Sequence, residues 1–422
     1  MARRRRLSSP APAAADLSDD LLWEILLRLP PLPSSLLRAS LVCRRWRHLA
    51  ADPAFLRRFR AFHRRSAPLL GFFRCSGNRA YFTSLMGPPD HIPAARFPPP
   101  CRGEHCSFFG CRHGLALILN RTRKEAVVWN PVSGDSRRVR FPRGEDIVFE
   151  AAVLRPAGFD HDLGQLSPFE LVFLCSRIRA SRLTALVARI YRSESGKWIS
   201  TGSAAALAAM PWRPVVGPSV MVGNTLCWLI GGGDILQVDL GTRRLAVIRM
   251  PLYLPLKFDF QILSLENNAL GFAVVSRELS LQLWQWKVEL NVWRLHRELE
   301  LGKLLSPAPS VGKVWTKLLG YAEDTNAIFI KWNDAAFMIQ LDSFLVTKIP
   351  ESTTNFPYYP AFSLQAGKLA VELLGMRCKK NCVSWICWWN HPIRIDDHLT
   401  RSLGASHGSA TIGTKFNIII RR

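Results

Sequence analysis

The chain has 422 residues, enough for two to three domains, and 48% of them are apolar, which supports a large core and argues against wholesale disorder. No apolar run is long enough to span a membrane, and the opening Met-Ala-Arg-Arg-Arg-Arg is not followed by the apolar segment of a secretory signal. A net charge of +24 favours acidic partners, and ten cysteines without a paired framework indicate a reducing compartment, so we expect the cytoplasm or the nucleus.

Residues 1–16 are mainly Arg, Ser, Pro and Ala, and we expect them to be a disordered basic N-terminus. Arg3–Arg6 could serve as a nuclear-localisation patch, but four residues are too few to establish one.

Residues 17–63 are expected to form a small helical domain. Its first helix begins near Ser18 or Asp19, whose side chains can accept hydrogen bonds from a free first turn, and it ends at Pro30-Pro31. A second helix is expected from Ser34 or Ser35 to about Leu41.

Two further helices follow in this domain. The third carries Val42, Trp46, Leu49 and Ala50 on one face. The last begins at Asp52-Pro53, where Asp acts as the cap and Pro fits the first helical position, and it runs through Phe55, Phe59 and Phe62.

The first helix is apolar on nearly every side, and only Glu24 and Arg28 are polar in its interior. A domain of this size has little core with which to cover such a helix. We therefore expect one side of the helix to pack into the domain and the other side to contact a partner protein.

The same stretch resembles an F-box. The family pattern is Leu-Pro-x-x-Leu-x-x-Glu-Ile-Leu-x-x-Leu-Pro, followed by Val-Cys-basic-x-Trp. The matching positions are Leu17, Leu21, Glu24, Ile25, Leu26, Leu29, Pro30, Val42, Cys43 and Trp46. Ser18 stands where the family usually has Pro, a mild change because Ser also begins helices well.

In this family the helices dock onto a Skp-type adaptor, which links them to a cullin scaffold and a RING ubiquitin ligase. The resemblance implies adaptor contacts from Leu17, Leu21, Glu24, Ile25, Leu29, Pro30, Val42, Cys43 and Trp46. Glu24 and the pair Arg44–Arg45 would lie at the rim of that contact.

Residues 64–105 are expected to be a linker that leads into the next domain, with candidate strands at Gly71–Arg74 and Tyr81–Leu85. Beyond them the sequence contains five polar turns flanked by apolar strands, which predict hairpins. These are Trp129–Arg137, Tyr191–Trp198, Val238–Leu245, Trp286–Trp293 and Leu341–Lys348.

The hairpins recur about every 50 residues, close to the period of kelch repeats, so residues 106–422 are expected to form a β-propeller-like domain. Blades stack radially because one small sheet cannot bury both of its faces. Tyr191-x6-Trp198 and Gly231–Gly233 resemble kelch features, although the other hairpins lack the Tyr–Trp pair. We expect Trp385, Trp388 and Trp389 in the last blade, and most of the fourteen Trp in the core between blades.

A helical domain followed by such blades resembles the plant F-box proteins that carry an F-box-associated, propeller-like region. Cys106–Leu117 and Val128–Pro131 are similar to the opening of that region.

Four groups of residues have side chains or spacings that could carry chemistry. Two clusters of cysteine and histidine lack the close spacing of a structural zinc site. The first cluster is Cys101, Cys106, Cys111 and His113, and the second is Cys378, Cys382, Cys387 and His391. Gly231–Gly233 lacks the Lys-Ser/Thr of a phosphate loop, and Asp396–His398 fits a solvated loop. We therefore expect no catalytic residue, metal or cofactor.

The sequence thus predicts a non-catalytic substrate-recognition subunit of a Skp–cullin–F-box ubiquitin ligase, whose propeller binds an unidentified target protein. Two alternatives remain, an enzyme that uses a pocket of the propeller and a basic protein associated with nucleic acid. The basic excess supports the second only weakly, because charge alone gives non-specific attraction.

Overall fold

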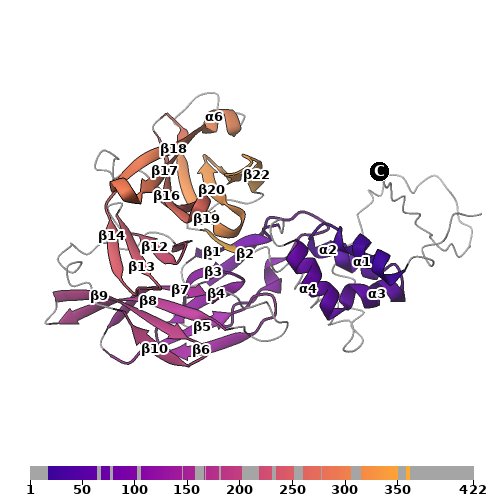
Figure 1. The fold of residues 1–422 in the computed structure, drawn as a ribbon, viewed down its shortest axis with the longest axis horizontal. Helices are drawn as coiled ribbons and strands as arrows, with labels where there is room; N and C mark the ends of the chain where they lie inside the picture. Colours follow the sequence, from indigo (N-terminus) through magenta and orange to yellow (C-terminus); the bar gives the residue numbers. More distant parts are fainter. Residues whose placement is uncertain are drawn as a thin grey trace, which may run out of the picture. The chain divides into compact units, whose positions relative to one another are not determined.

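The computed structural model describes residues 18–63, 68–76, 79–101, 106–144, 146–156, 166, 168–179, 182–201, 218–230, 234–250, 260–276, 278–305, 315–349 and 358–361. Four helices come first and strands follow (Figure 1). Several predictions lie outside the described residues, namely those for residues 1–16, Leu17, Gly231–Gly233, the Cys378–His391 cluster, the three C-terminal Trp and Asp396–His398.

The four helices are α1 (Asp19–Leu27), α2 (Pro33–Ser40), α3 (Arg44–Ala51) and α4 (Pro53–Phe62). Two predicted caps are confirmed. The Ser18 hydroxyl accepts a hydrogen bond from the Leu21 N–H at 3.3 Å, and the Asp52 carboxylate accepts one from the Phe55 N–H at 2.8 Å.

The predicted start of α2 at Ser34 or Ser35 is wrong. Pro33 is its first residue, because a proline ring already has a helical φ and lacks the N–H that a first turn leaves unpaired. The Ser34 N–H is satisfied by a residue far along the chain, donating to the buried Asp90 carboxylate at 2.7 Å. Asp90 lies in the segment between the second and third strands and supplies the missing cap.

The helical domain has a core of its own. Trp23 packs its ring edge against Phe55, with the ring centroids 5.8 Å apart. The buried apolar side chains are Leu26, Leu27, Leu36, Ala39, Phe55, Leu56 and Phe59. They come from three of the four helices, so one side of α1 is covered within the domain, as the sequence predicts.

Five four-stranded antiparallel sheets form the blades of a β-propeller in the described part of the chain (Figure 1). Their strands are β3 (Cys106–Arg112), β4 (Leu115–Asn120), β5 (Glu125–Trp129) and β6 (Ser136–Arg140); β7 (Ile147–Leu154), β8 (Glu170–Arg179), β9 (Arg182–Arg192) and β10 (Lys197–Ser200); β11 (Val220–Val222), β12 (Thr225–Leu229), β13 (Ile235–Asp239) and β14 (Leu245–Ile248); β15 (Phe260–Leu265), β16 (Ala269–Val275), β17 (Ser280–Lys287) and β18 (Val292–Glu300); β19 (Thr316–Ala322), β20 (Ala327–Trp332), β21 (Ala335–Gln340) and β22 (Val346–Ile349). Neighbouring blades contact each other through their first strands, as β3 does with β7 and β15 with β19. The first strands therefore surround the centre.

A three-stranded sheet links the two ends of this ring. It consists of β2 (Arg79–Ser84), β1 (Gly71–Ser76) and β23 (Tyr358–Ala361), with β1 in the middle and both pairings antiparallel. Its strand β23 contacts β3 of the first blade and β19 of the fifth. β1 and β2 include most of the two strands predicted within residues 64–105, so this stretch contributes to a sheet as well as leading into the propeller.

All five predicted hairpins are confirmed, and each is the turn between the third and fourth strands of a blade. In the second blade, Tyr191 pairs with Trp198 across the hairpin, and their ring centroids are 5.3 Å apart. Trp129 and Trp228 are among the largest fully buried side chains, as expected for Trp in the core, whereas Trp315 is exposed.

Bulges interrupt the first strands of three blades. The register shifts between Phe108 and Gly110, between Val148 and Glu150, and between Leu318 and Gly320. The bulge in β7 leaves the Glu150 carboxyl buried, where it accepts a hydrogen bond from the Ala151 N–H at 3.2 Å. Burial raises the pKa of Glu150 to about 8, because a charged carboxylate loses its hydration there.

We predict that Glu150→Gln stabilises the protein near pH 8. In the unfolded chain this carboxyl ionises near its ordinary pKa of 4.5, and in the folded chain near 8, so between these values the folded state binds the extra proton. The contribution of Glu150 to the free energy of unfolding therefore falls as the pH rises from 4.5 to about 8. The amide resembles the protonated carboxyl, so the variant should melt a few degrees higher at alkaline pH and show a flatter pH profile. Thermal unfolding followed by circular dichroism tests this, and an unchanged profile would contradict it.

Candidate functional site

Large apolar side chains lie exposed on the helical domain. Leu21 and Ile25 of α1 are 54% and 41% exposed, and Leu41 and Val42, between α2 and α3, are 57% and 62% exposed. On the adjacent face of α1, Leu22 and Leu26 are fully buried. Exposed apolar side chains that gather on one part of a small domain are typical of a protein-interaction surface.

An ion pair brings the two exposed segments toward each other. Asp19, the first residue of α1, accepts a hydrogen bond from Arg45 in the first turn of α3, with Nε–Oδ1 at 2.7 Å. The Cys43 sulfur caps α3 by accepting from the Trp46 N–H at 3.4 Å. The first turns of α1 and α3 therefore meet.

Charged side chains border this surface. Glu24 of α1 accepts a hydrogen bond from Arg58 of α4 at 2.6 Å and lies 3.3 Å from the Arg28 guanidinium. All three side chains are substantially exposed, so these pairs contribute little to stability by themselves. They do fix the position of the Glu24 carboxylate.

The structure separates the predicted contact residues into two groups. Leu21, Ile25, Pro30, Val42 and Cys43 are exposed, whereas Glu24, Leu29 and Trp46 are half-buried. Leu29 and Trp46 pack against the core of the helical domain. Leu17 lies outside the described residues.

Two details differ from the sequence-based expectation. Val42 lies before α3 and not on its apolar face, because the helix begins only after the Cys43 cap. Leu41 was not among the predicted contacts, yet it is as exposed as its neighbour Val42. Leu41, Val42 and Cys43 lie between α2 and α3, so neither helix buries them. Two apolar residues in such a short junction indicate an exposed contact, and this pattern could have identified Leu41.

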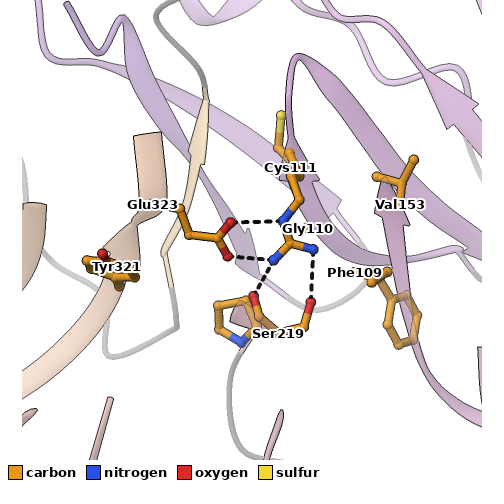
Figure 2. A pocket seen from close by; sticks show the side chains of 10 residues that line it. Phe109, Gly110, Cys111, Val153, Ser219, Tyr321 and Glu323 are labelled. Atoms are coloured by element: carbon orange, nitrogen blue, oxygen red, sulfur yellow. Dashed lines mark hydrogen bonds and ion pairs between the residues drawn. The ribbon is translucent and has the colours of Figure 1, made fainter. Parts of the chain in front are cut away.

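A second candidate is a small pocket at the centre of the propeller (Figure 2). Phe109 of β3 and Val153 of β7 lie on one side, and Tyr321 of β19 and Glu323, which follows β19, lie on the other; Arg112 of β3 also lines the pocket. The remaining lining residues are Gly110, Cys111, Ala152, Pro218 and Ser219.

Arg112 joins three blades in this pocket. Its guanidinium donates to both carboxylate oxygens of Glu323, at 2.6 and 3.1 Å, and to the backbone oxygen and hydroxyl of Ser219, at 2.7 and 3.3 Å (Figure 2). Glu323 Oε1 also accepts from the Met221 N–H at 2.9 Å. Arg112 is buried, and all three of its side-chain nitrogens donate hydrogen bonds within the fold. Its role is therefore to hold the first, third and fifth blades together.

The turn beside Arg112 carries further titratable groups. His113 and Gly114 have φ angles of 48° and 72°, as a tight two-residue hairpin requires, and His113 Nδ1 lies 3.9 Å from Asp324 Oδ1. Burial and the neighbouring Glu323 raise the pKa of Asp324 to about 7. Arg155 donates to the His113 carbonyl at 2.7 Å, and burial lowers its pKa from the usual value.

Metal binding and membrane insertion find no support in the described residues. No group of three or more His, Cys, Asp or Glu side chains among them could hold a metal ion. Cys106 is buried, and Cys101 and Cys111 are half-buried. None of the described helices is long and apolar enough to cross a membrane.

We predict that removing one partner of the central ion pair destabilises the propeller. Arg112→Ala leaves the Glu323 carboxylate buried without its main counter-charge, which costs about 3–5 kcal/mol. Adding Glu323→Gln should recover part of this loss, because no charge then remains unpaired. Arg138→Ala is the matched control, because Arg138 is 45% exposed and its ion pair with Glu125 is long, at 3.6 Å. Losing this pair should cost about 1 kcal/mol or less. Denaturant unfolding measures all four proteins, and equal losses for Arg112→Ala and Arg138→Ala would contradict the prediction.

Comparisons with known proteins support an F-box-like region in the helical domain. Residues 16–62 match the F-box-like family model. A protein of Arabidopsis thaliana named as an F-box protein is 31% identical over 133 residues, which are 30% of this chain and 36% of that protein, so the match spans about a third of that relative. Among solved structures, the WD40 domain of SCAP from fission yeast aligns with a TM-score of 0.33 and 15% identity over 58% of this chain and 50% of that one. The chain therefore carries an F-box-like helical region followed by a β-propeller.

Proposed function

We propose that this chain is the substrate-recognition subunit of a Skp–cullin–F-box ubiquitin ligase. The F-box-like region would dock on a Skp-type adaptor, and the propeller would hold a target protein for ubiquitination. The observation that carries the proposal is the exposure of Leu21, Ile25, Leu41 and Val42 inside the stretch that matches the F-box-like family.

Burial of these side chains against a partner would supply most of the binding free energy. Covering a large aliphatic side chain contributes about 1.5–3 kcal/mol when it is fully removed from water. These four side chains are only 41–62% exposed in the isolated chain, so a partner recovers only part of that amount from each. The losses of translational and rotational freedom offset much of this gain, so polar contacts around the surface would contribute as well. Glu24, which is fixed by Arg58, would lie at the polar edge of the contact.

The chain would carry out no chemistry itself in this role. It would hold the target near the ubiquitin-loaded enzyme and so raise the effective concentration of the two reactants. The central pocket of the propeller gives little support to an enzyme, because Arg112 and Glu323 already pair with each other. A kelch-like character of the blades and a relationship to the plant F-box-associated region stay predictions.

We predict that Leu21→Asp together with Ile25→Asp abolishes binding to a Skp-type adaptor. Two carboxylates would replace apolar contacts at the centre of the interface, and the loss of both contacts alone corresponds to roughly 100-fold or more in affinity. Both positions are exposed in the isolated chain, so the fold should be unaffected. Co-purification and titration calorimetry with purified adaptor measure the effect.

The matched control is Val288→Asp together with Leu290→Asp in the turn η3 (Val288–Leu290) between β17 and β18. These residues are 73% and 54% exposed, and they belong to the propeller. This variant should bind the adaptor as the wild type does. If the wild type does not bind adaptor, or if both variants lose it equally, the proposed function is wrong.

A further inference from the structure

Basic side chains gather where the first two blades meet, on one rim of the propeller. They come from the turn between β4 and β5, the connection between β6 and β7, and the strands β8 and β9. The members of this basic rim are Arg121, Arg123, Lys124, Arg143, Arg177 and Arg189.

Specific contacts hold these residues together. Arg121 of the first blade donates to the Val148 carbonyl of the second at 2.8 Å. Asp146 accepts from Arg177 at 3.0 Å and from Arg189 at 2.6 Å, so one carboxylate fixes two guanidinium groups. Arg121 also lies over the Phe109 ring, 5.7 Å from its centroid, which restricts the guanidinium further.

The nearby acidic groups that the structure describes do not cancel this positive charge. Asp146 is shared between two guanidinium groups, and these interactions hold its pKa below the usual value. Glu125 is half-buried and lies 3.6 Å from Arg138. Glu150, the other carboxyl near Arg121, has its pKa raised to about 8 by burial and is mostly uncharged at neutral pH. Arg121, Arg123, Lys124 and Arg143 remain exposed to solvent.

Positive charge is not spread evenly over the turns of the propeller. In an antiparallel blade, the turn after the third strand lies at the opposite end from the turn after the second. The hairpins after the third strands carry both signs of charge, as with Asp239 beside Arg243 and Arg244. Among the described turns after a second strand, those of three other blades contain Asp234, Glu278 and Asp334, whereas the turn between β4 and β5 contains Arg121, Arg123 and Lys124 and no acidic residue. The positive charge is therefore local to the first two blades.

We propose that the basic rim binds an acidic segment of the protein that the propeller recruits. This inference rests on the proposed function and adds the chemistry of the target. Acidic side chains of an extended segment would pair with Arg121, Lys124 and Arg143. Ile147, which is 52% exposed beside Asp146, would contact an apolar residue of the same segment.

The composition of the rim favours an acidic protein segment over a nucleic acid. Proteins that bind single strands place exposed aromatic rings under the bases. Among the described residues of this rim, the large exposed apolar side chain is aliphatic, Ile147. Phe109, Phe141 and Phe149 are half-buried there.

The test uses the full chain and three charge reversals on the basic rim, Arg121→Glu, Lys124→Glu and Arg143→Glu. The matched control changes the charge equally on the opposite rim, with Lys197→Glu, Arg243→Glu and Arg244→Glu, which are likewise exposed. The probe is a short fluorescein-labelled peptide of glutamate, serine and leucine, with a lysine-containing counterpart and single-stranded DNA and RNA of similar length. Fluorescence anisotropy is measured at low and at physiological salt.

We expect the reversals on the basic rim to weaken binding of the acidic peptide about tenfold or more at low salt, and the control to change it by less than about twofold. A neutralising variant, Arg121→Gln, Lys124→Gln and Arg143→Gln, should give an intermediate loss, and thermal melting checks that all variants are folded. The inference is overturned if the wild type does not bind the acidic peptide, if the two sets of reversals weaken binding equally, or if the oligonucleotides bind more tightly and depend on the same residues.

Adaptor retention separates this inference from the proposed function. Both charge-reversal variants should keep the adaptor, because neither changes the F-box-like region. A chain that binds the acidic peptide through the basic rim but never retains adaptor would overturn the proposed function and leave the acidic-peptide site in place.

Discussion

The buried ion pair between Arg112 and Glu323 is the constraint on which the centre of the propeller depends. It joins the first blade to the fifth, and the hydrogen bonds to Ser219 and Met221 add the third blade. Blade-to-blade contacts elsewhere are mainly apolar and therefore not directional. A bidentate guanidinium–carboxylate pair requires one geometry, so it fixes how these blades are set around the centre.

The helical domain uses its apolar residues in two ways. Side chains on one side of α1 complete a core with α2 and α4, while Leu21 and Ile25 remain in water. Exposed apolar side chains of this kind are typical of an interaction surface. The propeller has its own distinctive surface, because exposed basic side chains gather where its first two blades meet.

Local signals accounted for much of the fold. Ser18 and Asp52 marked two helix starts, and the five polar turns marked all five outer hairpins, because caps and tight turns depend on a few neighbouring residues. Contacts between distant residues could not be predicted in this way. The Asp90 cap on α2, the pairing of Arg112 with Glu323 and the gathering of basic side chains at the first two blades each require the folded arrangement. Leu41 was missed because the family pattern does not include it and because the end of a predicted helix gives no sign of which side chains stay exposed.

The pairing of β1 with β23 has a consequence for the order in which the chain folds. The two strands are separated by nearly the whole propeller sequence, so this pairing has a very high sequence separation and closes late. The helical domain depends mostly on local contacts and emerges first from the ribosome, so it can fold while the blades are still being made. A growing chain would thus hold a folded helical domain before the ring of blades closes.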